Sequence, residues 1–175
     1  MLILRLIFIT IIGFYFVKHF DHLIDQKMSE VEPPHKPFTT MAQRDREIEC
    51  LAKNIYYEAA TEPFEGKVAV AQVTINRTKS PHFPKDICSV VYETNFVYNR
   101  LICQFSWYCE SKTKVRPIHM ESYREAEAVA KRVLLEGYKL NIITEDVLYY
   151  HADYVNPRWK KQRVAKIGKH IFYKG

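Results

Sequence analysis

Residues 43–75 read QRDREIECLAKNIYYEAATEPFEGKVAVAQVTI, and this stretch decides the fold. Apolar side chains recur at offsets 0, 3, 4, 7 and 11 from Ile48, which is the period of an amphipathic helix and predicts a first helix over residues 43–60. A second helix is predicted to start at Pro63, because proline suits the first helical position. The two helices therefore meet at a sharp corner over residues 61–63.

The rest of the chain after this pair predicts one more helix and a small sheet. A third helix is predicted over residues 121–136, with Gly137 in the left-handed conformation that often ends a helix. Residues 147–150 predict a strand, and the runs RVAKI and HIFYK, separated by residues 168–169, predict a hairpin. Residues 79–114 show neither period, so we expect loops with little regular structure. Helices first and a small antiparallel sheet last make the fold class α+β.

The amino terminus has a different composition from the rest of the chain. The twelve residues from Leu6 to Val17 carry no charge, which is short for a membrane span of about 20 residues but typical of a signal-sequence core. Small residues that would suit a cleavage site do not follow, so we expect an uncleaved hydrophobic anchor helix over residues 1–28. A buried core helix is the alternative. Proline-rich residues 29–40 predict a stiff linker, and residues 41–175 a single folded domain.

The charge of the chain is +6, from 26 Lys and Arg against 20 Asp and Glu. Seven basic residues and no acidic residue follow Asp153. Such a tail is compatible with nucleic-acid binding or with a solvated basic face, but an exported domain meets anionic envelope polymers and lipid headgroups first. We therefore expect no nucleic-acid partner. The expected location is the membrane, through the anchor, with the folded domain in the periplasm or cell envelope.

Four cysteines lie in the predicted domain: Cys50, Cys88, Cys103 and Cys109. They are separated by 37, 14 and 5 residues without a C-x-x-C pair, which argues against a structural zinc site. In an exported domain an even number of cysteines predicts two disulfides, for which three pairings are possible. We favour Cys50 with Cys88, and Cys103 with Cys109 around a small aromatic loop; free buried thiols are the alternative. We expect neither a metal nor a cofactor.

Glu58 is the leading candidate for chemistry. It falls in the last turn of the first helix, about 20° around the axis from Leu51, and so at the border of the apolar stripe. Apolar surroundings disfavour the charged carboxylate and raise its pKa, as a general acid requires near neutral pH. A solvated helix glutamate is the alternative. Glu62 and Glu65 are weaker candidates, because helix starts attract acidic side chains through the dipole alone.

Aromatic and polar residues alternate without a regular period in CQFSWYCES (residues 103–111) and YYHADYVNPRW (residues 149–159). Aromatic rings commonly fill protein cores, but core packing does not require the polar neighbours found in these two segments. We therefore favour a ligand cleft that holds sugar rings. Its predicted lining consists of Gln104, Phe105, Ser106, Tyr150, His151 and Tyr154.

Taken together, five segments resemble the bacterial cell wall hydrolases of the spore cortex-lytic type, the SleB/CwlJ family. These segments are CLAKNIYYEAATEPFEGKVAVAQVTINR, FPKDICSVVYE, CQFSWYC, LYYHADYVNPRW and VAKIGKHIFY, in this order from Cys50 to Tyr173. The resemblance implies a lysozyme-like fold whose catalytic acid is the glutamate of YYEAATEP, Glu58. The family pattern has an arginine where this chain has Ala60, so a salt bridge from that position is not expected.

The resemblance also implies the substrate, which is the peptidoglycan glycan strand between N-acetylmuramic acid and N-acetylglucosamine. We find no second carboxylate that the sequence places across a cleft from Glu58, as two-carboxylate glycosidases need. A single acid suffices if the 6-hydroxyl of the substrate attacks and forms a 1,6-anhydro sugar. We therefore expect a lytic transglycosylase, with water-mediated hydrolysis as the alternative. A glycan-binding envelope module without catalytic activity is the rival function.

Overall fold

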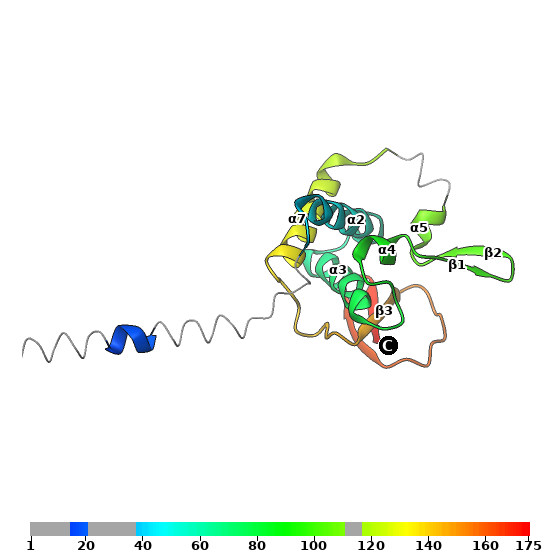
Figure 1. Ribbon diagram of the computed structural model, residues 1–175. Coiled ribbons are helices and arrows are strands. Elements are labelled where there is room, and N and C mark those ends of the chain that lie inside the picture. The colour runs from blue at the N-terminus through cyan, green and yellow to red at the C-terminus, as the bar shows by residue number, and fades with distance from the viewer. Residues whose placement is uncertain (1–14, 21–37, 111–116) are drawn as a thin grey trace, which may run out of the picture. The chain divides into compact units, whose positions relative to one another are not determined.

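The structure, a computed structural model, describes residues 15–20, 38–110 and 117–175 (Figure 1). The expected anchor, residues 1–28, lies outside the described residues except for 15–20, which are helical. The expected linker, residues 29–40, is described only from residue 38 onward. Within these described ranges, no helix has both the length and the hydropathy that crossing a membrane requires.

The chain divides into two units, Met1–Pro33 and Pro34–Gly175. In chain order the second unit contains α2 (Met41–Ala59), α3 (Phe64–Lys79), α4 (Ile87–Val91), β1 (Thr94–Val97), β2 (Arg100–Cys103), α5 (Ser106–Cys109), α7 (Met120–Leu135), β3 (Val147–Ala152), β4 (Arg163–Ile167) and β5 (His170–Lys174). The predicted α+β class is confirmed.

The predicted corner between the first two helices is present. α2 starts after Thr40, whose hydroxyl accepts a hydrogen bond from the amide of Gln43 and so caps the helix. At the other end, the amide of Glu62 donates to the carbonyl of Ala59 at 3.0 Å. The sequence predicted Pro63 to be the first helical residue of α3. In the structure Pro63 is the N-cap, and the helix begins one residue later, at Phe64.

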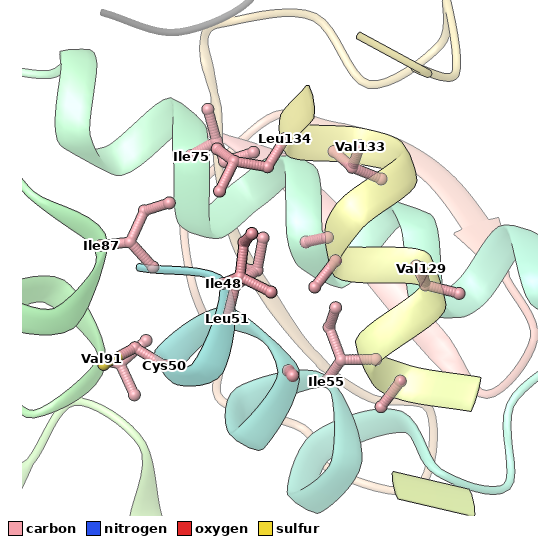
Figure 2. Close-up of a cluster of buried hydrophobic side chains, with 14 of the residues drawn as sticks. Ile48, Cys50, Leu51, Ile55, Ile75, Ile87, Val91, Val129, Val133 and Leu134 are labelled. Atoms are coloured by element: carbon pink, nitrogen blue, oxygen red, sulfur yellow. The ribbon is translucent and has the colours of Figure 1, made fainter. Parts of the chain in front are cut away.

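α3 is the central element, because every residue from Gly66 to Thr78 is buried. The apolar side chains of α2, α3, α4 and α7 meet in one cluster, in which Leu51 and Ile55 of α2 lie between α3 and α7 (Figure 2). On the opposite side of α3, Val70 and Val73 pack against Phe172 of the sheet in a second cluster. The helix therefore separates two apolar layers, which an amphipathic pattern alone does not predict.

Buried polar side chains of α3 fix the path of the chain into β3. Gln72 donates to the carbonyls of Leu140 and Ile143, and Asn76 donates to those of Thr144 and Val147. Each buried amide group is thereby satisfied by the main chain.

The sheet is antiparallel with the strand order β3-β5-β4. The β4–β5 hairpin has the predicted strands and turn, and Gly168 in this turn has a φ of 56°. A side chain at Gly168 would also collide with Glu62, since a Cβ built there would lie 1.9 Å from Glu62 Oε2. Glycine is therefore favoured at position 168 by its backbone conformation, and a larger residue would also have to displace the Glu62 carboxylate.

The prediction of irregular structure over residues 79–114 is wrong. This segment contains α4, α5 and a β1–β2 hairpin that projects from the helices in Figure 1. Both faces of β1 are exposed, so no alternation of buried and exposed positions marks the strand in the sequence. The turn has positive φ at Tyr98 and Asn99, as a type I′ turn needs, but it lacks the glycine that usually identifies such a turn.

Both predicted disulfides are confirmed. Cys50 of α2 is joined to Cys88 of α4, and Cys103 of β2 is joined to Cys109 of α5. The first bond attaches α4 to the helical core, where Cys50 and Val91 are neighbours in Figure 2. The second holds the hairpin against the short α5 helix.

Candidate active site

A cleft of about 510 Å³ opens beside the C-terminal end of α2. It is bounded by the end of α2, by α5 and the residues after it, and by β3 and β5. Its lining consists of Tyr56, Tyr57, Glu58, Ala60, Thr61, Ser106, Trp107, Glu110, Pro117, Tyr150, His151, Ala152, Tyr154 and His170. The cleft combines aromatic rings with a few polar groups, as ligand sites generally do.

Glu58 lies in this cleft, half-buried in the last turn of α2. Burial raises the pKa of its carboxyl to about 7, and the charge of Glu110 adds to the rise. A hydrogen bond from Tyr150 and the charge of Arg77 lower this pKa but do not cancel the effect of burial. Glu58 is therefore protonated in a large share of molecules at neutral pH, which a proton donor requires.

One hydrogen bond orients the Glu58 carboxyl. The hydroxyl of Tyr150 in β3 donates to Glu58 Oε2 at 3.2 Å. Burial, followed by the charge of Glu58, raises the pKa of Tyr150 well above its usual value, so its hydroxyl keeps the proton that it donates. The ion pairs among the described residues do not include Glu58.

Arg77 supplies the positive charge near Glu58. Its guanidinium is buried, its Nε donates to the carbonyl of Leu148 at 2.9 Å, and it lies over the rings of Phe83 and Phe105, each 5.2 Å away. Its Nη1 atom is buried without a hydrogen-bond partner among the described residues. A fixed cation in this position favours the carboxylate that Glu58 becomes after it releases a proton.

The aromatic wall of the cleft is held in place from behind. The rings of Tyr57 and Trp107 are stacked with centroids 4.5 Å apart. Trp107 Nε1 donates to Asn54 Oδ1 at 3.1 Å, and Asn54 in turn donates to Thr74 Oγ1 in α3. This wall is therefore attached to the most buried helix of the domain, and its flat faces are suited to contact with a sugar ring.

Four of the six predicted cleft residues line the cleft: Ser106, Tyr150, His151 and Tyr154. Phe105 does not, because its side chain is buried in the core beneath Arg77. Gln104 is also absent from the lining. The imidazole of His151 is bound to the Ala152 carbonyl and to the Tyr173 hydroxyl, so both of its ring nitrogens already have partners.

The sequence reasoning missed two titratable residues in the cleft. Glu110 directly follows the second disulfide loop, in a segment without a helical or strand period that could have placed it in the same cleft as Glu58. His170 is the first residue of β5, and its place opposite Ala152 brings it to the same cleft as Glu58. Period-two alternation from Phe172 would have assigned His170 to the inner face of the sheet.

Glu62 has a structural contact with the β4–β5 turn, which its position at the helix start did not predict. Its carboxylate accepts a hydrogen bond of 2.7 Å from the amide of Lys169 in the β4–β5 turn. Its Oε2 atom also lies 4.0 Å from His170 Nδ1. Glu62 is not among the residues that line the cleft.

Several comparisons place the chain among known proteins. The family model described as cell wall hydrolase matches residues 61–173, beginning three residues after Glu58. The spore cortex-lytic enzyme of Bacillus subtilis is 32% identical over 135 residues, which cover 73% of this chain and 37% of that protein. The chain spans about a third to a half of the length of the curated relatives it matches.

Two solved structures have a similar fold. The catalytic domain of the Bacillus cereus SleB protein has a TM-score of 0.58 and 25% identity, covering 82% of this chain and 98% of that one. The catalytic domain of the germination-specific lytic transglycosylase SleB from Bacillus anthracis has a TM-score of 0.56 and 26% identity, covering 79% and 99%. With the family model matching well over half of its residues, this chain belongs to the cell wall hydrolase family.

Proposed function

We propose that this protein degrades peptidoglycan, cutting the glycan strand between N-acetylmuramic acid and N-acetylglucosamine as a lytic transglycosylase. The observation that carries the proposal is Glu58, a carboxyl with a pKa raised to about 7 in the cleft of a cell wall hydrolase domain. The substrate class is supported by the relatives that are spore cortex-lytic enzymes. The reaction type is supported by the similar domain described as a lytic transglycosylase.

The reaction begins with proton transfer from Glu58. The carboxyl gives its proton to the glycosidic oxygen, the bond from that oxygen to C1 of the muramic acid breaks, and positive charge develops on the sugar ring. Tyr150 keeps the carboxyl oriented, and the fixed charge of Arg77 stabilises the carboxylate that remains. Stacked Tyr57 and Trp107 offer a flat surface for a neighbouring sugar.

The second half of the reaction needs a nucleophile at C1. In a lytic transglycosylase this is the 6-hydroxyl of the same muramic acid, and its attack closes a 1,6-anhydro ring. In the simplest form of this reaction, the carboxylate of Glu58 takes the proton that the hydroxyl loses, so one carboxyl acts as acid and then as base.

Glu110 is the other carboxyl among the described residues of the cleft, and it makes hydrolysis the rival mechanism. A two-carboxylate enzyme would use it to activate water or to attack C1. The variant Glu110→Gln separates the mechanisms. We expect it to keep substantial activity and the anhydro product, whereas a loss as large as that of Glu58→Gln would indicate a second catalytic carboxylate.

Digestion of purified sacculi tests the proposed function. We expect the wild-type chain to release soluble muropeptides whose muramic acid ends are lighter by one water than hydrolysed ends, as mass spectrometry would detect. Hydrolysed ends would overturn the transglycosylase mechanism but not the enzyme. A chain that sediments with sacculi and releases nothing would be a glycan-binding module, and the enzyme proposal would fail.

We also propose that the domain acts in the cell envelope from a membrane anchor. The uncharged amino-terminal segment supports this location, as do the two disulfides, which persist in oxidising compartments. Fractionation of producing cells, with detection of the full chain in membranes and accessibility of the domain to protease added outside, tests it.

A further inference from the structure

The described cleft contains a second group that could move a proton, His170. It is buried, with a relative exposure of 7%, yet it belongs to the cleft lining. Its edge packs against the ring of Tyr150, with centroids 5.2 Å apart, and Tyr150 is the residue that holds Glu58. Glu58 and His170 therefore contact two different parts of one side chain.

The two ring nitrogens of His170 have different surroundings. Nδ1 is fully buried, has no hydrogen-bond partner among the described residues, and lies 4.0 Å from Glu62 Oε2. Nε2 is not among the fully buried atoms that lack a partner, and the strand residue opposite His170 is the small Ala152, which also lines the cleft. At this distance Glu62 acts on the ring through its negative charge and not through a hydrogen bond, and Nε2 is the ring nitrogen that can accept a proton from the cleft.

We propose that His170, next to the negative charge of Glu62, is the base that takes the proton of the attacking hydroxyl in the second half of the reaction. The inference rests on the proposed function, and it makes Glu58 the acid alone. The bond from the 6-oxygen to C1 forms while the O–H bond of that hydroxyl breaks. The proton moves to His170 Nε2, and the imidazolium is balanced by the Glu62 carboxylate. Solvent then carries a proton from His170 back to the carboxylate of Glu58.

The groups that face His170 are compatible with this role. Burial lowers the pKa of its imidazole, and the nearby His151 lowers it further, while Glu62 and Asp153 raise it. The imidazole is therefore neutral at neutral pH and free to accept a proton, while the Glu58 carboxyl retains one. A raised pKa in one group and a lowered pKa in a neighbouring group are typical of a catalytic acid and base.

The pH dependence of the initial rate of muropeptide release provides the test. In the full-length protein we expect His170→Gln to reduce the rate about 100-fold and to remove the acidic limb of the profile. Glu62→Gln should move that limb to lower pH, because the carboxylate that stabilises the imidazolium is gone. His82→Gln, which removes an exposed histidine outside the cleft, is the matched control and should leave the profile unchanged.

Separate outcomes identify which proposal fails. A structural role for His170 predicts a lower melting temperature, with the acidic limb of the remaining activity unchanged, and this result overturns the inference. So does a His170→Gln variant with the wild-type rate. In either case an inactive Glu58→Gln leaves the proposed function standing. If Glu58→Gln instead keeps the wild-type rate, the proposed function itself is wrong.

Discussion

A glutamate lies near each end of α2, buried at one end and half-buried at the other, and the two have different hydrogen-bond partners. Glu47 in the second turn and Glu58 in the last turn lie eleven residues apart, and so on nearly the same side of the helix. Burial is the largest cause of a raised pKa at both. At Glu47 hydrogen bonds from backbone amides counteract this rise in pKa. One of them is a 2.7 Å hydrogen bond that the carboxylate accepts from Ile87 at the start of α4.

Glu58 receives no such backbone donor among the described residues. Its hydrogen bond comes from one side chain, Tyr150, at 3.2 Å, and its other side faces a cleft. The two glutamates of one helix therefore differ in the number of hydrogen bonds that stabilise their charged form. The buried carboxyl of Glu47, with main-chain partners, connects two elements, whereas the half-buried carboxyl of Glu58, with few donors, favours its protonated form.

The largest expected effect is on enzymatic activity, which substitution of Glu58 should abolish and substitution of Glu47 should not. Glu58→Gln should fold normally and lose at least about 1000-fold in muropeptide release, because the amide cannot donate the proton that the reaction requires. Glu47→Gln should keep the wild-type rate per folded molecule. Initial rates on sacculi, normalised to the folded fraction from circular dichroism, measure both. Equal losses of rate in the two variants would show that Glu58 has no role in activity that Glu47 lacks.

The next effect concerns the cross-link beside Glu47. Removing the Cys50–Cys88 disulfide with paired alanines should cost up to about 4 kcal/mol of unfolding free energy, since the bond spans 38 residues. The Cys103–Cys109 bond spans 6 residues, and its removal should cost about 2 kcal/mol. Urea denaturation of the two double variants gives the comparison. A greater loss from the shorter loop would contradict this order.

A smaller change in stability is expected for Glu47→Gln. The amide still offers an oxygen to the Ile87 amide, but its NH₂ group cannot accept the hydrogen bond that the Cys88 amide makes with the carboxylate, so the variant should lose about 1–3 kcal/mol. Denaturation at neutral pH measures this loss. If Glu58→Gln is destabilised to the same extent, then Glu58 also holds the fold together.

The pH dependence of stability sharpens the contrast. The pKa of Glu58 rises from the ordinary 4.5 to about 7 in the folded protein, so the folded state binds the proton more tightly than the unfolded chain. The contribution of this protonation to the free energy of unfolding is therefore fully present below pH 4.5, declines as the pH rises and is lost above about pH 7. Glu58→Gln should make the melting temperature less dependent on pH in this window. An unchanged slope would contradict the raised pKa.

The smallest effect is expected from Tyr150→Phe. Its hydroxyl lowers the pKa of Glu58, so removing it should move the alkaline limb of the rate profile upward by up to about one pH unit. The initial rate between pH 5 and 9 measures the shift. A movement to lower pH would show that Tyr150 acts on another group.

Local pattern predicted the elements whose apolar residues recur at a regular period or whose turn is marked by a glycine. The three long helices follow from their apolar period, and the β4–β5 turn follows from Gly168 between two short runs. The β1–β2 hairpin has no buried face and no glycine at its turn, so neither signal was present. Glu58 was predicted to lie at the border of the apolar stripe with a raised pKa, because its position around the helix axis could be calculated. Glu110 and His170 reach the cleft through tertiary folding, which periodicity does not encode.

The polar face of α3 carries a consequence for sequence divergence. Gln72, Asn76 and Arg77 bind the segment before and within β3 through its carbonyl oxygens, not through its side chains. Such contacts depend on the path of the backbone and not on the side chains of the segment. Exposed positions such as Asn141 could therefore be exchanged during evolution while the strand beneath the cleft keeps its alignment.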